Sequence, residues 1–196
     1  MRNRPKQTFV PWAVRVILGS FILFILMLWF VVKPGEAENQ ALKALGGSEV
    51  KEALEAPDFI IQTPDGKALH LKDYRGKAIL LNFWATWCGP CAKELPKMAK
   101  LYEQYKDKGF VLIGVSLDFG NPEVVKAFLE ERGLNFPVGI DTEKEAVKAY
   151  GVRGLPTSYF INPQGKVVGW LTGERDWEGE AAHHLIKSLL DQAPKG

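Results

Sequence analysis

Cysteine is scarce in this chain. The 196 residues include two cysteines and three histidines. With one pair of cysteines there is no further cysteine for a structural disulfide. Metal binding by the adjacent His183 and His184 is disfavoured as well, because neighbouring positions on a helix point about 100° apart and do not readily share one ion. The sequence therefore predicts no metal site.

An excess of charge of one sign is also lacking. The formal net charge is +2 at pH 7, and it arises in residues 1–56, which hold seven Lys and Arg against five Glu. Residues 57–196 hold 18 charges of each sign, so this part is neutral. A protein that binds nucleic acid carries a basic patch or stripe. No basic stripe interleaved with aromatic residues is found, and nucleic acid is excluded as a main partner.

Charged residues are absent from residues 16–32, which are nearly all Val, Ile, Leu, Phe, Met or Trp. At ~1.5 Å per residue a helix of this length spans roughly 25 Å, and extension back to Trp12 brings it to about the thickness of the hydrocarbon core of a bilayer. Four basic residues and no acidic residue precede the run, which favours a cytoplasmic N-terminus. We therefore expect a single-pass anchor in the cell membrane, with the rest of the chain outside the cytoplasm.

A cleaved signal peptide is the competing interpretation of this apolar run. The apolar core of a signal peptide is normally ~7–15 residues long and ends in a small-residue cleavage site. This run is longer and ends in Val32, Lys33 and Pro34, so a retained anchor is favoured. A lipid anchor is disfavoured because no cysteine follows the run.

Residues 33–56 have the composition of a linker. Pro34 and Gly35 open the segment, Gly46 and Gly47 interrupt it, and mostly Ala, Glu, Leu and Lys lie between them. This pattern predicts two short helices of marginal stability in a mobile stalk. The expected parts of the chain are a cytoplasmic N-terminus (1–15), a transmembrane anchor (16–32), a stalk (33–56) and a folded domain (57–196).

The folded domain alternates between strand and helix patterns. A strand, turn and strand come first, over residues 59–71, with Asp65 and Gly66 as the turn signal. Two continuous apolar runs, 78–84 and 110–116, flank a helical pattern, which predicts parallel neighbouring strands joined by a helix. The later patterns predict, in order, a helix from Asn121, a strand over 136–140, a helix opened by a capping box at 142–145, strands over 158–161 and 166–171, and a closing helix over 176–192. The sequence thus predicts an α/β domain with an N-terminal hairpin.

The two cysteines lie where the strand pattern of residues 78–84 gives way to helical spacing. Free N–H groups and the helix dipole favour a thiolate at the start of a helix. Cys88 is expected just before the first turn, as the nucleophile, and Cys91 inside that turn, facing inward, as the resolving thiol. A bare C-x-x-C pattern also fits half of a zinc site, but the context favours a redox pair that forms a Cys88–Cys91 disulfide.

The longer run Asn-Phe-Trp-Ala-Thr-Trp-Cys-Gly-Pro-Cys-x-x-Glu-x-Pro, residues 82–96, resembles the membrane-anchored ResA/TlpA group of thioredoxin-like proteins. The resemblance implies a thioredoxin-like fold and a protein-disulfide reductase that needs no cofactor beyond its cysteine pair. The hairpin over 59–71 resembles the N-terminal extension of this group and of peroxiredoxins. A peroxiredoxin is excluded, because its P-x-x-x-[TS]-x-x-C pattern meets Leu81 and Ala85 here in place of Pro and of Thr or Ser.

A disulfide reductase also needs a group that takes the proton of its buried resolving thiol. In thioredoxin a buried acid lies six residues before the first cysteine, where this chain has Asn82, which cannot titrate. Glu94 lies three residues after Cys91 on the same helical face. The resemblance to the ResA/TlpA group likewise implies Glu94 as the acid/base residue. The alternative is that Glu94 is an exposed first-turn acid that only stabilises the helix dipole.

A second loop belongs to the predicted site by resemblance. The pattern Gly-Val-x-Gly-x-Pro-Thr over residues 151–157 resembles the thioredoxin loop whose cis proline faces the cysteine pair and leaves backbone groups free for an extended substrate. The resemblance implies a cis Leu155–Pro156 bond. The residues expected to bind the target protein are Trp87, Gly89, Pro90, Leu155, Pro156 and Thr157.

The resemblance also implies partners. A membrane thiol donor of the CcdA/DsbD type would re-reduce the cysteine pair, and the target would be a specific protein disulfide, often that of apocytochrome c before haem attachment. A general extracytoplasmic thioredoxin-like reductase stays open as an alternative. From another class, a Cu(I) carrier is the rival, since two thiolates hold Cu(I). Copper-delivering relatives usually add a histidine or space their cysteines as C-x-x-x-C, and neither feature is evident.

Overall fold

The structure, a computed structural model, describes residues 34–193. The predicted cytoplasmic N-terminus (1–15) and the predicted anchor (16–32) lie outside the described residues. Within the described part of the chain, no helix has the length and apolar character needed to cross a bilayer. The anchor therefore stays a prediction.

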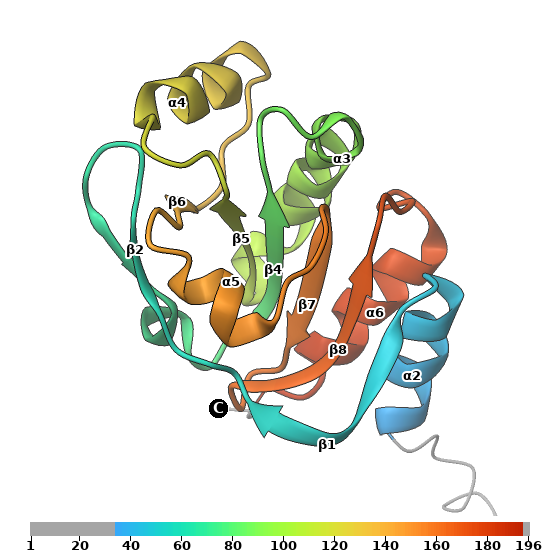
Figure 1. Ribbon diagram of the computed structural model, residues 1–196. Coiled ribbons are helices and arrows are strands. Elements are labelled where there is room, and N and C mark those ends of the chain that lie inside the picture. The colour runs from blue at the N-terminus through green and yellow to red at the C-terminus, as the bar shows by residue number, and fades with distance from the viewer. Residues whose placement is uncertain (1–33, 194–196) are drawn as a thin grey trace, which may run out of the picture. The chain divides into compact units, whose positions relative to one another are not determined.

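An eight-stranded mixed sheet forms the centre of the described chain, with strand order β1-β8-β7-β4-β5-β6-β2-β3 (Figure 1). Strands β4, β5 and β6 are parallel to one another, and all other neighbours are antiparallel. The predicted N-terminal hairpin is confirmed as β2 and β3, and β2 also pairs with β6. The strands are β1 (Ser48–Glu55), β2 (Ile60–Gln62), β3 (Ala68–His70), β4 (Ala78–Trp84), β5 (Phe110–Ser116), β6 (Val138–Ile140), β7 (Thr157–Ile161) and β8 (Lys166–Thr172).

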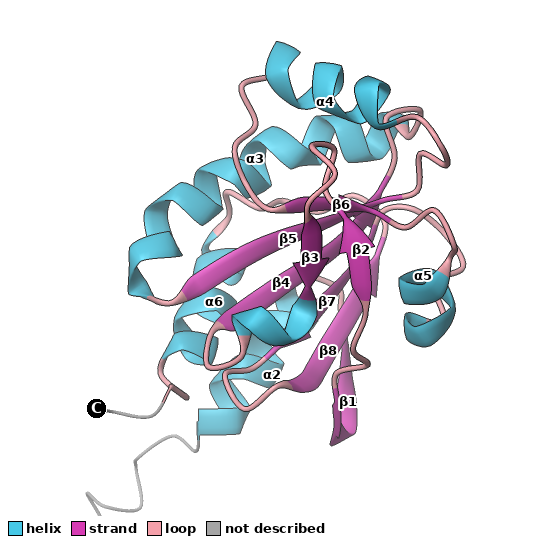
Figure 2. Cartoon of the chain, turned by 90° about the vertical axis from the view of Figure 1, so that its left-hand side faces the viewer, coloured by secondary structure: helices cyan, strands magenta, loops and turns pink. Residues whose placement is uncertain are grey.

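Helices cover both faces of the sheet. The α-helices are α2 (Pro34–Ala44), α3 (Gly89–Tyr105), α4 (Pro122–Glu131), α5 (Glu145–Tyr150) and α6 (Glu180–Leu190). Helices α2, α3 and α6 lie on one face and α5 on the other (Figures 1 and 2). Side chains alternate along β4, so Leu80 and Trp84 join the core cluster under α3 and α6, whereas Leu81 and Phe83 join the cluster under α5. Burial on both faces explains why β4 and β5 are almost entirely apolar, with Asn82 and Ser116 as the polar exceptions.

The structure corrects the predicted stalk. Residues 34–55 form α2 and β1 and belong to the same compact unit as the rest of the described chain. Strand β1 pairs with β8, with an irregular register between Glu49 and Leu54, and α2 packs against α6. Leu42 of α2 is fully buried. Helix α2 would be marginal alone and is stabilised by this burial. Strand β1 finds its backbone hydrogen-bond partners on β8. The composition of residues 33–56 reveals neither contact.

Two predicted helix starts are also corrected. The capping box expected from Thr142 is not used, because the side chain of Asp141 accepts hydrogen bonds from two backbone N–H groups at the start of α5. The closing helix begins at Glu180, and Trp177 precedes it in a loop. This loop position places the Trp177 side chain within reach of α3.

Candidate active site

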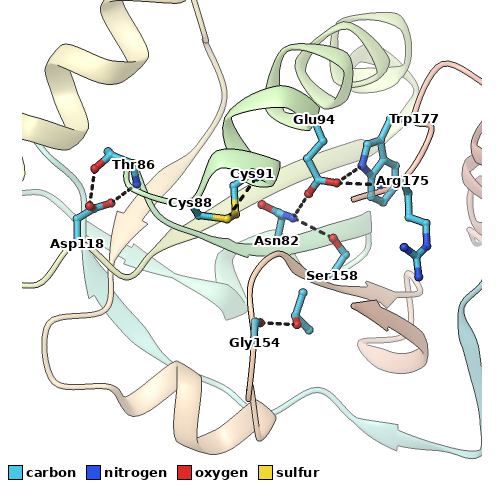
Figure 3. Close-up of a disulfide and its surroundings, with 11 residues drawn as sticks. Asn82, Thr86, Cys88, Cys91, Glu94, Asp118, Gly154, Ser158, Arg175 and Trp177 are labelled. Atoms are coloured by element: carbon cyan, nitrogen blue, oxygen red, sulfur yellow. Dashed lines mark hydrogen bonds between the residues drawn. A yellow bond between two sulfur atoms is a disulfide. The ribbon is translucent and has the colours of Figure 1, made fainter. Parts of the chain in front are cut away.

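The two cysteines form a disulfide at the N-terminus of α3 (Figure 3). Cys88 is the residue that caps the helix, and its Sγ accepts a hydrogen bond of 3.3 Å from the backbone N–H of Cys91. The sulfur therefore occupies the place of an N-cap oxygen, where the helix favours negative charge. Cys91 is fully buried and Cys88 is 6% exposed, so Cys88 is the more accessible sulfur, as the sequence predicts.

The loop that precedes Cys88 is held by Asp118, which sequence analysis missed. Its carboxylate accepts hydrogen bonds from the backbone N–H of Thr86 at 2.9 Å and from the Thr86 hydroxyl at 2.6 Å. The Ser116 hydroxyl donates to the same carboxylate at 2.8 Å. Because Ser116 ends β5 and Thr86 follows β4, this network ties together the carboxyl ends of two parallel strands. No spacing in the sequence signals such a pairing of short polar residues.

Glu94 lies on α3 and is 1% exposed, which rules out the alternative of an exposed first-turn acid. Its Oε1 accepts a hydrogen bond from Asn82 Nδ2 at 3.3 Å. Its Oε2 accepts hydrogen bonds from Trp177 Nε1 at 2.9 Å and from the backbone N–H of Arg175 at 3.2 Å (Figure 3). These donors explain how a carboxyl group is tolerated without contact with water.

Burial raises the pKa of Glu94 to about 7. The hydrogen bonds from Trp177, Arg175 and Asn82 favour the charged form and oppose this rise, while the charge of Glu174 adds to it. A carboxyl group with a pKa near 7 gains and loses a proton readily at neutral pH. This is the property that general acid–base catalysis requires.

Asn82 takes the position of the thioredoxin acid and is fully buried. Its Nδ2 donates to Glu94 and, at 2.9 Å, to Ser158 Oγ on β7. Both amide protons are therefore used, and the orientation of the amide is fixed. In Figure 3 its carbonyl oxygen is turned away from Glu94, and within residues 34–193 this oxygen has no hydrogen-bond partner. Asn82 thus supports the Glu94 carboxylate but cannot replace it as a base.

The loop before β7 has the form that the resemblance implies, since the Leu155–Pro156 peptide bond is cis. An open groove brings this loop to Cys88, and four of the predicted target-binding residues line it: Trp87, Gly89, Pro90 and Leu155. Trp87 is 69% exposed, as a contact residue must be. Pro156 is buried. Thr157 donates its hydroxyl to the Gly154 carbonyl and lines a neighbouring groove, so it is placed beside the cysteine groove and not in it.

A match to a known family covers most of this architecture. Residues 53–169, from within β1 to within β8, match the model of the AhpC/TSA family. The chain belongs to the AhpC/TSA family. The matched residues include both cysteines, Glu94 and the loop with the cis proline.

Relatives within the AhpC/TSA family narrow the class. The thiol-disulfide oxidoreductase ResA of Bacillus subtilis is 42% identical over 129 residues, which are 65% of this chain and 71% of the relative. ResA of Geobacillus thermodenitrificans is 36% identical over 172 residues, 86% of this chain and 94% of the relative. A solved structure described as the thiol:disulfide interchange protein DsbE of Chlorobium tepidum superposes with a TM-score of 0.66 at 35% identity and covers 72% of this chain and 99% of its own.

These similarities place the chain among the thiol-disulfide oxidoreductases of the AhpC/TSA family, with a thioredoxin-like α/β fold. Enzymes of this class use a cysteine pair and no cofactor. Within the residues that the structure describes, no group of His, Cys, Asp and Glu is arranged to hold a metal ion.

Proposed function

We propose that this enzyme is tethered to the cell membrane and reduces protein disulfides outside the cytoplasm. Apocytochrome c is the proposed target, and a membrane thiol donor of the CcdA/DsbD type is the proposed source of electrons. The disulfide between Cys88 and Cys91, at a helix N-terminus and beside an open groove, carries this proposal. The tether rests on the apolar residues 16–32, and the target and donor rest on the similarity to the ResA/TlpA group.

The reaction uses the reduced cysteine pair. The Cys88 thiolate attacks one sulfur of the target disulfide, a Cys88–target S–S bond forms, and the other target sulfur leaves with the electron pair and takes up a proton. Cys91 then attacks the Cys88 sulfur, which forms the Cys88–Cys91 disulfide and releases the second target sulfur as a thiol. The target gains two electrons, and the donor must return two electrons to the enzyme before the next cycle.

Glu94 serves the second of these attacks. Cys91 is fully buried, and a thiolate is disfavoured away from water, so the attack requires a base nearby. The Glu94 carboxylate accepts the Cys91 proton, directly or through one water, and passes it on to the departing target thiolate or to solvent. The rise of the Glu94 pKa to about 7 keeps both protonation states accessible at neutral pH.

Trapping in cells tests the target. The full chain with Cys91→Ser cannot resolve the intermediate, so it is expected to accumulate as a mixed disulfide between Cys88 and its target after alkylation and separation without reductant. The matched control, Cys88→Ser, is expected to trap nothing. Recovery of an apocytochrome c supports the proposed target, whereas mixed disulfides with many unrelated proteins would indicate a general reductase. Absence of any adduct with Cys91→Ser would refute the assigned roles of the two cysteines.

Labelling of intact cells tests the location. A membrane-impermeant maleimide, applied after mild reduction, is expected to label Cys88 in whole cells. Labelling that appears only after the cells are lysed would place the cysteine pair in the cytoplasm and overturn the proposed topology.

A further inference from the structure

Two grooves meet at the loop that leads to the cis proline. The first contains Cys88 and is bordered by Trp87. The second runs beside the end of α5 over β7 and β8, where Tyr159 and Trp170 line it. Residues 152–154 line both grooves. A ligand that enters the first groove can therefore continue across this loop into the second.

The second groove lies on a part of the sheet face that no described helix covers. In Figure 1, α2 and α6 lie behind β8, and the side of β8 that faces the viewer is open. A Cβ atom on Gly169 would meet Leu42 of α2, so the next residue, Trp170, faces the opposite side of the sheet. Trp170 is 40% exposed although β8 is paired on both sides, with β7 and with β1. Tryptophan is enriched among the residues that dominate the binding energy of protein interfaces, so Trp170 is a suitable contact for a bound polypeptide.

Among the residues that the structure describes, Arg153 is the only one with a charged side chain that lines either groove. It is exposed, and within residues 34–193 no carboxylate pairs with it. The remaining lining of the two grooves consists of aromatic, apolar, glycine and hydroxyl residues and of Cys88. A single unpaired guanidinium group between apolar walls fits a ligand that carries one carboxylate among apolar groups.

The loop also offers unpaired backbone groups. Within the described part of the chain, the backbone N–H and C=O groups of Arg153 and Leu155 make no hydrogen bond. An extended peptide is able to pair with such groups in the manner of an added strand. Pairing of this kind gives affinity without sequence preference, so the side chains that flank it must supply the specificity.

We propose that the target polypeptide binds in extended form across residues 152–154, with its disulfide at Cys88 and its chain continuing to Trp170. A carboxylate of the target pairs with Arg153, and an aromatic or large apolar residue further along packs on Trp170. The enzyme thereby selects protein disulfides that are flanked by an acidic and then an apolar residue. This inference rests on the proposed reductase function and adds the substrate class to it.

Synthetic substrates test this preference with the full chain. Three peptides contain one intramolecular disulfide followed by Glu, Gln or Lys and then by Trp, and a fourth contains Glu but ends before the Trp. The readout is kcat/KM for each peptide divided by that for a small neutral disulfide, 2,2′-dithiodipyridine. The variants are Arg153→Gln, Arg153→Glu and Trp170→Ala. The matched controls are Arg75→Gln and Ile60→Ala, which change an exposed arginine and an exposed isoleucine outside both grooves.

The wild-type chain is expected to favour the Glu peptide over the Lys peptide by about two- to fivefold, since an exposed ion pair changes a binding constant by up to about fivefold. Arg153→Gln is expected to abolish this preference and Arg153→Glu to invert it. Trp170→Ala is expected to lower the value for the Glu peptide to that of the shortened peptide. The two control variants are expected to keep the wild-type order.

Equal normalised kcat/KM values for the Glu, Gln and Lys peptides would overturn the inference, and so would an unchanged order of the three peptides in Arg153→Glu. In either case, reduction of the small disulfide would still support the proposed reductase function. Failure of the wild-type chain to reduce the small disulfide would instead refute the proposed function itself. A second copy of this chain is the rival occupant of the groove. If Trp170→Ala converts a dimer to a monomer in sedimentation and leaves the peptide values unchanged, the groove is a self-association surface and the inference is wrong.

Discussion

Removal of the hydrogen bond from Trp177 to Glu94 tests the role of Glu94 as the proposed base, because it changes the pKa of Glu94. In Trp177→Phe a smaller aromatic ring replaces the indole that packs on Phe160, and the Nε1–H donor to Glu94 Oε2 is lost. Hydrogen bonds to charged groups contribute roughly 1.5–3 kcal/mol, and one pKa unit corresponds to about 1.36 kcal/mol. The pKa of Glu94, about 7 in the intact enzyme, is therefore expected to rise by roughly 1–2 units in the variant.

The resolving step reports this change. Reduced enzyme is mixed with a disulfide substrate, the reaction is quenched with acid at set times, and mixed disulfide is separated from fully oxidised enzyme. The rate of resolution is expected to rise with pH around a midpoint near 7 in the wild type, as Glu94 loses its proton. At pH 7 the Trp177→Phe variant is expected to resolve roughly 5–50-fold more slowly, with most of the loss recovered by about pH 9.

Two reference variants make the result decisive. Glu94→Gln removes the titrating group and is expected to lose the limb near pH 7 altogether. Glu103→Gln changes an exposed glutamate on the same helix and is expected to keep the wild-type profile. If Glu94→Gln keeps the wild-type midpoint, or if Trp177→Phe lowers the rate equally at every pH, Glu94 is not the base and Trp177 acts through packing alone.

Further predictions concern stability. Folding raises the pKa of Glu94 from 4.5 to about 7, so its contribution to stability is complete below pH about 4.5 and is lost as the pH rises through about 7. The free energy of unfolding in urea, measured for the wild type relative to Glu94→Gln, is therefore expected to fall by about 3 kcal/mol across this pH range. Leu42→Ala is expected to lower the free energy of unfolding by about 2–5 kcal/mol because Leu42 is fully buried. Leu54→Ala, which changes an exposed residue, is expected to change it by less than about 0.5 kcal/mol. Equal effects of the two substitutions would instead support a mobile stalk. Asp118→Ala is expected to cost about 1–3 kcal/mol in urea unfolding and to speed alkylation of reduced Cys88 by freeing its loop, and an unchanged alkylation rate would refute that positioning role.

The sequence predicts best those elements in which successive residues are all buried. Strands β4 and β5 are predicted with their observed bounds because every residue of each strand is buried, which leaves a run that is apolar except for Asn82 in β4 and Ser116 at the end of β5. The position of Cys88 as the cap of α3 follows from the same change of pattern, since a strand signal ends and a helical one begins at that point. Local signals of this kind need no knowledge of the tertiary structure.

Other features depend on partners that are distant in the chain. Arg175 and Trp177 reach Glu94 across 81 and 83 residues, and no local pattern signals such contacts. Strand β1 is mainly polar, with three Glu, one Lys and one Ser among its eight residues, and becomes a strand because the edge of β8 is available to it. The sequence therefore identifies Glu94 as a candidate, but it does not reveal the burial and the donors that determine its proton affinity.

The proton affinity of Glu94 depends on one segment that precedes α3 in the sequence and on another that follows it. Asn82 reaches it from β4, inside the segment that matches the AhpC/TSA family, whereas Arg175 and Trp177 reach it from the loop after β8, beyond residue 169, where that match ends. All three donors favour the carboxylate, so loss of the contacts from the loop after β8 would leave burial less opposed and the carboxyl group protonated at neutral pH. The cysteine motif alone therefore does not fix the rate of the resolving step. That rate also depends on the hydrogen bonds that the loop between β8 and α6 donates to Glu94.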